Sequence, residues 1–278
     1  MTIGKRIDPA RVGLSKSLMT SPCERKGFFS ETVRDANGRR LSFPLPERVT
    51  FGTAVDDATA YILHHDRSDE PWLVEDAIRV GMDSAREAKG WPLVTDPETF
   101  EVQVTNAVGL YCSQPDGLAR IRALYPENVR LQGDNGRSLR AGDVIGTPDI
   151  LTDRRVIDIK TWGRNDGERK VWKSPEMGLY AYLFTAESGA LPETVVYQAY
   201  IRVSRPYWTW IEAEATTELV DFGRETAAHW RALLEIGRPE LFTTDTTYCG
   251  DCPFRAPMPE VGHDGCSVGR LVPMEKAA

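Results

Sequence analysis

The sequence predicts an α/β fold, in which a sheet of short strands lies beside helices. Strand-like runs occur at residues 128–132, 143–145, 156–160, 194–203 and 207–213. Apolar residues recur at helical spacing at residues 71–89, 97–124 and 216–236. Strands alternate side chains between two faces, whereas amphipathic helices repeat every three to four residues, so the two patterns separate the two kinds of element. With 278 residues, the chain can form one large domain or two small ones.

Composition and charge exclude few classes of protein. The hydrophobic content of 41% and charged content of 27% are ordinary for a soluble globular protein. No run approaches the length of a membrane span, and the polar N-terminus lacks a signal-peptide core, so we expect a cytoplasmic protein with no membrane partner. A net charge of −7 argues against a general polyanion-coating protein, although a local basic groove can still hold phosphates.

The stretch from Gly146 to Thr161 places three charged side chains in an apolar setting. It is typical of two short strands joined by a polar turn, with Asp149 beside the first strand and Asp158 and Lys160 on one face of the second. Burying an unpaired charge costs free energy, so we expect these side chains to have compensating partners or a ligand. Two carboxylates are hard ligands for Mg²⁺ or Mn²⁺, and a lysine can orient water or offset phosphate charge. The alternative is a surface ion pair on an edge hairpin.

A basic segment follows directly, from Trp162 to Lys173. It contains Arg164, Arg169 and Lys170 among Gly, Asn and Trp residues. Such a loop beside a metal site suits phosphate contacts, and Trp162 or Trp172 would offer a stacking surface for an unpaired base. The alternative is a solvated loop, because charge runs usually face water.

The spacing of the three charged residues resembles that of a known family. Pro148-Asp149, eight intervening residues and then Asp158-Ile159-Lys160 are similar to the motif of the PD-(D/E)XK nuclease superfamily. The resemblance implies a restriction-endonuclease-like core, with a central mixed sheet flanked by helices. It also implies that Asp149 and Asp158 bind the metal ion, together with the Ile159 carbonyl, and that Lys160 assists the attacking water.

Two further motifs resemble those of RecB-like nucleases. Their Gly-x-x-x-His motif corresponds to Gly52 through Asp56, so the resemblance implies that Asp56 ligates the metal in place of histidine. The alternative for Asp56 is an acid in the first turn of a helix, where the helix dipole favours it. Their Gln-x-x-x-Tyr motif corresponds to Glu176 and Tyr180, on a helix that begins at Ser174-Pro175. In that family these two positions hold the substrate near the metals.

Five cysteines are present, and three of them lie near the C-terminus. An odd number in a chain without a secretion signal disfavours a disulfide framework. Cys249 and Cys252 form a Cys-x-x-Cys motif that does not open a helix after a strand, which disfavours a thioredoxin-like redox pair. A structural zinc site, with His263 as a possible ligand, stays open. RecB-like nucleases of the four-cysteine class instead hold a 4Fe–4S cluster with one early and three late cysteines. This resemblance implies that Cys23, Cys249, Cys252 and Cys266 are the cluster ligands.

The resemblance extends from Ser15 to Cys266. It implies a single nuclease domain over residues 1–278, with 66–125 as a helical insertion and 245–278 joined to Cys23 by the cluster. The implied activity is metal-dependent exonuclease cleavage of DNA that is single-stranded or has free ends, in CRISPR adaptation or in phage recombination or repair, with protein partners from those pathways. Two alternatives remain. The departures at Asp56 and Glu176 fit a non-catalytic nucleic-acid-binding or assembly module, and a structure-specific endonuclease would share the same site.

Overall fold

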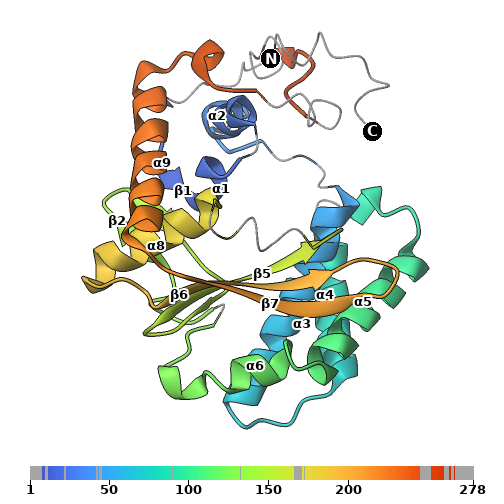
Figure 1. Ribbon diagram of the computed structural model, residues 1–278. Helices are drawn as coiled ribbons and strands as arrows, with labels where there is room; N and C mark the ends of the chain where they lie inside the picture. Colours follow the sequence, from blue (N-terminus) through green and yellow to red (C-terminus); the bar gives the residue numbers. More distant parts are fainter. Residues whose placement is uncertain are drawn as a thin grey trace.

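The computed structural model describes most of the chain. The described residues are 8–9, 12–21, 23–41, 43, 46–88, 91–131, 133–165, 171, 173–244, 252–259, 263 and 266. A sheet crosses the middle of the molecule in Figure 1, with α3, α4, α5 and α6 on one side and α8 and α9 on the other. Within the described part of the chain, no helix is both long enough and apolar enough to cross a membrane.

In the described chain, β1 is followed by a run of helices, and the other strands come after that run. The strands are β1 (Leu14–Ser15), β2 (Leu139–Ala141), β3 (Val144–Gly146), β4 (Ile150–Leu151), β5 (Arg155–Trp162), β6 (Thr194–Ile201) and β7 (Tyr207–Glu214). The α-helices are α1 (Lys16–Met19), α2 (Glu24–Thr32), α3 (Glu47–Arg67), α4 (Val74–Glu87), α5 (Pro97–Ser113), α6 (Leu118–Arg122), α8 (Pro175–Ser188) and α9 (Thr217–Ile236). The 3₁₀ helices are η2 (Trp91–Leu93), η3 (Tyr125–Glu127) and η4 (Pro239–Leu241).

The main sheet has the strand order β4-β5-β6-β7. Strands β5 and β6 are parallel and are connected through α8, whereas β4–β5 and β6–β7 are antiparallel. A second sheet has the order β1-β3-β2, in which β1 pairs in parallel with β3. The mixed sheet that the family resemblance implies is therefore confirmed, as are the strands that the sequence predicts at β5, β6 and β7.

The two faces of the main sheet support two separate cores. On one face, Val156 of β5 packs with residues of α8 and α9 and with the N-terminal elements α1 and α2. On the other face, Ile157 and Ile159 of β5 pack with α3, α4, α5 and α6. Alternation along β5 thus sends neighbouring side chains into different cores, and this fixes the direction in which its charged residues point.

Helix α8 begins where the sequence predicts and is held close to α9. The Ser174 hydroxyl accepts a hydrogen bond from the Met177 N–H at 3.3 Å, and Pro175 occupies the first helical turn. Gly178 faces Gly223 of α9, and a Cβ on Gly223 would overlap the Gly178 carbonyl oxygen. The close approach leaves α8 little freedom to shift, so the residues of its first turn are firmly placed.

The strand predicted at 128–132 is not formed in the described part of that segment. Asn128 adopts a left-handed conformation, and Arg130 makes only an isolated bridge to Leu151. Side chains take two of the backbone groups that a strand would use: Arg67 donates to the Val129 carbonyl at 2.9 Å, and the Leu131 N–H donates to Asp134. The strand prediction was wrong because local β-propensity did not register these side-chain contacts. Gln132 lies outside the described residues.

Candidate active site

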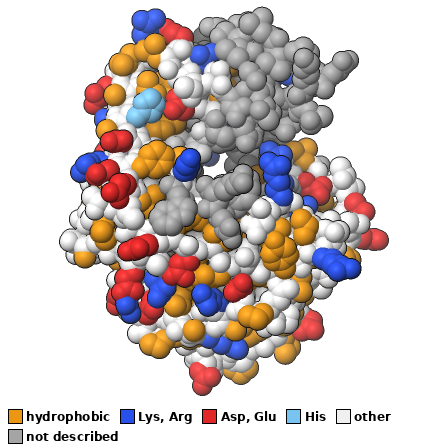
Figure 2. All heavy atoms as spheres, viewed as in Figure 1, with side chains coloured by type: hydrophobic (Ala, Val, Ile, Leu, Met, Phe, Trp, Pro, Cys, Tyr) orange, Lys and Arg blue, Asp and Glu red, His pale blue; other side chains and the backbone are white. Residues whose placement is uncertain are grey.

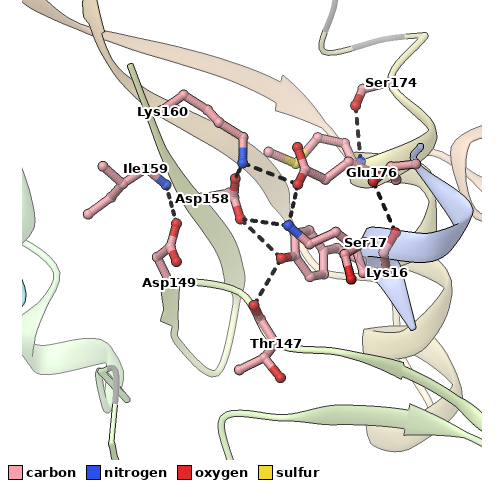
Figure 3. Close-up of polar contacts among 12 residues, drawn as sticks. Lys16, Ser17, Thr147, Asp149, Asp158, Ile159, Lys160, Ser174 and Glu176 are labelled. Atoms are coloured by element: carbon pink, nitrogen blue, oxygen red, sulfur yellow. Dashed lines mark hydrogen bonds and ion pairs between the residues drawn. The ribbon is translucent and has the colours of Figure 1, made fainter. Parts of the chain in front are cut away.

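Strand β5 carries the two charged residues of the Asp-x-Lys motif on the face that meets α8. Asp158 is 1% exposed, and its neighbours Ile157 and Ile159 point into the opposite core. The Lys160 ammonium forms an ion pair with Asp158 and lies 3.2 Å from Glu176 Oε1 (Figure 3). A buried carboxylate is thus matched by a cation from its own strand, two residues away.

Asp149 lies just before β4 and reaches across to β5. Its Oδ2 accepts a hydrogen bond from the Ile159 N–H at 2.6 Å, as Figure 3 shows. Burial raises the pKa of Asp149 to about 7, and the negative charge of Asp158 adds to this effect. Asp149 and Asp158 therefore lie near each other, although Asp149 precedes β4 and Asp158 belongs to β5.

Asp56 approaches the same place from helix α3. It lines one small pocket together with Asp149 and Ile159. Burial raises the pKa of Asp56 well above its usual value, and the negative charges of Asp149 and Asp158 raise it further. Three carboxylates that repel one another are gathered here, and such an arrangement suits a divalent cation.

Lys160 is held in its charged form. Burial alone would lower its pKa, but the carboxylates of Asp158, Glu176 and Asp149 hold that pKa well above the ordinary lysine value. A lysine that stays protonated can donate hydrogen bonds and offset negative charge. It is not suited to remove a proton from water.

The first two turns of α8 supply Glu176 and Tyr180. Glu176 Oε2 accepts a hydrogen bond from the Tyr197 hydroxyl at 3.1 Å. The Tyr180 ring is fully buried, and its hydroxyl lies 3.0 Å from both Asp158 Oδ1 and the Thr147 carbonyl oxygen. Tyr180 therefore orients Asp158 in this structure, and its hydroxyl links the Asp158 strand to the segment that leads to Asp149.

The sequence-based predictions missed Lys16, which also reaches this site. Its ammonium forms an ion pair with Glu176 and lies 3.8 Å from Asp158 Oδ1 (Figure 3). It is also 5.4 Å from the centre of the Tyr180 ring. Lys16 and Glu176 are 160 residues apart in the chain. No local periodicity relates two residues so distant. The one feature of the sequence that draws attention to Lys16 is its position at the start of a helix, just after Leu14 and Ser15.

The donors around this site fit a hard divalent cation. Asp56, Asp149, Asp158 and the Ile159 carbonyl offer oxygen ligands of the kind that Mg²⁺ and Mn²⁺ prefer. Formally, four carboxylates face two ammonium groups, which leaves two negative charges for such an ion. In the described part of the chain, no three His, Cys, Asp or Glu side chains are arranged as a metal-ligand set. Here Asp158 is turned toward Lys160, and Asp149 toward the Ile159 N–H.

Three of the four cysteines of the predicted cluster lie in described segments. Cys23 and Cys266 are buried and Cys252 is half-buried, and none of the three forms a disulfide. Burial raises the pKa of the Cys252 thiol, and the nearby Cys23 and Cys266 thiols raise it further. Cys252 thus lies near both the early Cys23 and the late Cys266, although these described thiols are not arranged as a metal-ligand set. Cys249 lies outside the described residues.

His263, the possible zinc ligand, is 2% exposed and lies against aromatic rings. Its ring centre is 4.5 Å from that of Phe29 and 5.5 Å from that of Phe254, and its Nε2 is 3.2 Å from the Phe254 carbonyl oxygen. These surroundings are those of a packed core residue. Neither a zinc site nor an iron–sulfur site is established by these contacts, and both stay predictions.

Only part of the predicted basic segment is described. Trp162 ends β5, and its ring centre lies 5.1 Å from that of Tyr197, which hydrogen-bonds Glu176. Arg169, Lys170 and Trp172 lie outside the described residues. On the face shown in Figure 2, acidic and basic side chains are interspersed among hydrophobic ones.

A search of curated proteins found no match. Among solved structures, a candidate exonuclease from Eubacterium rectale is 11% identical, with a TM-score of 0.49 over 88% of this chain and 89% of that chain. A protein named SSO0001 is 12% identical, with a TM-score of 0.33 over 80% of this chain and 89% of that chain. We draw no functional conclusion from either likeness.

The family assignment comes from a different comparison. The model of the PD-(D/E)XK nuclease superfamily matches residues 28–256, which include the whole main sheet and both strands of the motif. The mixed α/β architecture is consistent with the restriction-endonuclease-like fold of that superfamily. The chain belongs to the PD-(D/E)XK nuclease superfamily.

Proposed function

We propose that this protein is a divalent-metal-dependent deoxyribonuclease that hydrolyses phosphodiester bonds from free DNA ends. One observation carries the proposal: Asp149, which lies just before β4, comes together with Asp158 and Lys160 of β5, and Asp56 joins them from a helix. Repelling carboxylates beside a fixed ammonium suit a site that binds a metal ion and a phosphate.

Each side chain has a role that follows from its contacts. Asp56, Asp149, Asp158 and the Ile159 carbonyl would hold Mg²⁺ or Mn²⁺, which when bound supplies a Lewis acid and lowers the pKa of a bound water. Lys160, which stays charged, would orient that water and offset charge on the phosphate. Tyr180 would keep Asp158 in position through its hydroxyl.

The preference for free ends rests on the RecB-like pattern. The residues at its two additional motifs, Asp56 on one side and Glu176 and Tyr180 on the other, all contact or adjoin the Asp158–Lys160 pair. Trp162 leaves the same strand and would offer an aromatic ring to an unpaired base. We therefore propose single-stranded DNA with a free end as the substrate. The pathway implied by the resemblance, CRISPR adaptation or phage recombination and repair, stays a prediction.

The test is cleavage of end-labelled single-stranded DNA with Mg²⁺ or Mn²⁺, compared between wild type and Lys160→Ala. We expect Lys160→Ala to lose activity by on the order of 10²- to 10³-fold, because it removes a charged donor at the reacting phosphate. Arg79→Ala, an exposed ion-pair residue on α4, is the matched control and should behave as wild type. Equal product from wild type and Lys160→Ala would remove the proposed role of this lysine.

Circular DNA of the same sequence separates the alternatives. An exonuclease leaves circular single-stranded DNA intact, whereas an endonuclease cleaves it. Binding of DNA without cleavage under any divalent ion would instead indicate the non-catalytic module. Each outcome selects one of the three candidates, because the exonuclease, the endonuclease and the non-catalytic module share a fold but differ in what they do to the DNA.

We further propose that Cys23, Cys249, Cys252 and Cys266 hold a 4Fe–4S cluster that joins the two ends of the chain. Support comes from the position of Cys252, which lies near enough to Cys23 and Cys266 for both thiols to raise its pKa. Anaerobic purification followed by an absorbance spectrum and metal analysis tests this. Iron together with acid-labile sulfide would support the cluster. A colourless protein with one equivalent of zinc would contradict it and indicate a zinc site instead.

A further inference from the structure

The backbone of Lys16 is held in place by a strand pairing and a helix cap. Strand β1 pairs in parallel with β3, with Ser15 opposite Ile145. The Ser15 hydroxyl then accepts a hydrogen bond from the Leu18 N–H at 3.3 Å and caps the helix that Lys16 begins. The Lys16 side chain therefore starts from a defined point at the edge of the second sheet.

The Lys16 ammonium contacts the groups that surround Lys160. It forms an ion pair with Glu176 and lies 3.8 Å from Asp158 Oδ1. The Lys16 side chain is 22% exposed, so it is largely withdrawn from solvent but still has an open side. A partly buried cation beside two carboxylates interacts more strongly than an exposed pair would.

Glu176 is shared between two lysines. Its Oε1 is paired with Lys16 and lies 3.2 Å from the Lys160 ammonium, while its Oε2 receives the Tyr197 hydroxyl. Lys160 in turn is shared between Glu176 and Asp158. If Asp158 held a metal ion, Glu176 would be the remaining carboxylate partner of Lys160. The net negative charge on Glu176 would then set how strongly the Lys160 ammonium is held there.

We propose that Lys16 is a positioning residue of this site, which neutralises Glu176 and so leaves Lys160 available to the attacking water. The inference rests on the proposed nuclease function. It also accounts for the departure from the RecB-like pattern, in which position 176 would be a neutral Gln. A Glu paired with Lys has no net charge, so Lys16 and Glu176 together are electrically equivalent to the amide.

Four proteins test the proposal in one assay: wild type, Lys16→Met, Glu176→Gln and the double variant. Methionine keeps an apolar stem near the Tyr180 ring and removes the charge. We expect Lys16→Met to lower kcat by about tenfold on end-labelled single-stranded DNA with Mn²⁺, with KM changed by less than about twofold. The double variant should return to within about threefold of Glu176→Gln alone, because glutamine cannot hold Lys160 as an ion pair.

Binding of Mn²⁺, measured from the spin resonance of the free ion, gives a readout that does not depend on cleavage. Glu176→Gln leaves two lysines facing Asp158 and should weaken Mn²⁺ binding by about tenfold, and the added Lys16→Met should restore it. Arg79→Met, which removes an exposed cation on α4, is the matched control and should change neither quantity. Thermal unfolding of all variants shows which effects come from lost stability.

The outcomes separate this inference from the proposed function. If wild type cleaves DNA and Lys16→Met has the same kcat, Lys16 is not a positioning residue. A double variant no more active than Lys16→Met would also overturn the inference, because Lys16 would then not act through Glu176. A wild type that cleaves no DNA with either metal ion would overturn the proposed function, and the role of Lys16 with it.

Discussion

Two carboxylates on the same helix, Asp56 and Asp66 of α3, are in opposite electrostatic environments. Asp66 is paired with Arg122, whose Nε lies 2.9 Å from Oδ2, and accepts the Tyr125 hydroxyl at 2.8 Å. The hydrogen bond from Arg122 lowers the pKa of Asp66, although burial opposes this. At Asp56, burial raises the pKa, and Asp149 and Asp158 raise it further.

The opposite pKa shifts distinguish a carboxylate whose charge stabilises the fold, Asp66, from one whose charge destabilises it, Asp56. Asp66 gains partners when the chain folds, so its charge favours the native state. Asp56 gains like-charged neighbours, so its charge disfavours the native state unless a cation binds. Among buried acids, an unfavourable environment is therefore the better indicator of a functional site.

The largest expected difference between the two kinds of carboxylate is in activity. Asp158→Asn should reduce DNA cleavage with Mg²⁺ by on the order of 10³-fold or more, because a neutral amide is a poor ligand for a hard cation. Asp66→Asn should stay within about twofold of wild type at 25 °C, since Asp66 contacts Arg122 and Tyr125 and none of the site residues. Single-turnover cleavage rates measure both. Comparable losses in the two variants would contradict the distinction.

The same comparison predicts opposite changes in stability. Asp66→Ala should lower the free energy of unfolding by about 2 kcal/mol, because Arg122 and Tyr125 lose a charged hydrogen-bond partner. Asp56→Asn should raise it in metal-free buffer, since it removes a repelling charge. Urea unfolding in the presence of a chelator tests both signs. A destabilised Asp56→Asn variant would show that the repulsion is not felt in the metal-free protein.

Binding of a metal ion should offset the repulsion among the carboxylates of the site and so stabilise the folded protein. At a Mg²⁺ concentration ten times the dissociation constant, linkage predicts a gain of about 1.4 kcal/mol in the free energy of unfolding. Asp149→Asn should lose most of this gain, while Asp66→Asn should keep it. Thermal unfolding at increasing Mg²⁺, with matched ionic strength, measures the effect. An equal gain in Asp149→Asn would place the bound ion elsewhere.

The smallest expected effect is a pH dependence at the C-terminal end of α3. Arg67 forms an ion pair with Asp134 and lowers the pKa of Asp134 to about 2. Because the folded pKa lies below the unfolded value of about 3.9, this contribution is present above pH 4 and is lost as the pH falls toward 2. Solvent screening limits it to less than about 1 kcal/mol. The difference in stability between wild type and Asp134→Asn should shrink over that range, and a constant difference would contradict the assignment.

Local sequence patterns determined the elements of the site. Alternation along β5 predicted that Asp158 and Lys160 share a face, and Ser174-Pro175 predicted the start of α8; both predictions are confirmed. These patterns depend on backbone geometry over a few residues, which the sequence encodes directly. The same reasoning failed at 128–132, where the side chains of the distant Arg67 and the nearby Asp134 use backbone groups of the predicted strand.

Only the tertiary structure decided which charges meet. The pairing of β1 with β3 brings Lys16 to Glu176, and the packing of α3 on the sheet brings Asp56 to Asp149. Neither contact has a signature in the local pattern, because each joins segments whose separation along the chain carries no periodicity. The sequence by itself determined the family motif and the faces of its strands. The balance of charge around that motif depends on long-range packing, and so only the folded chain decided it.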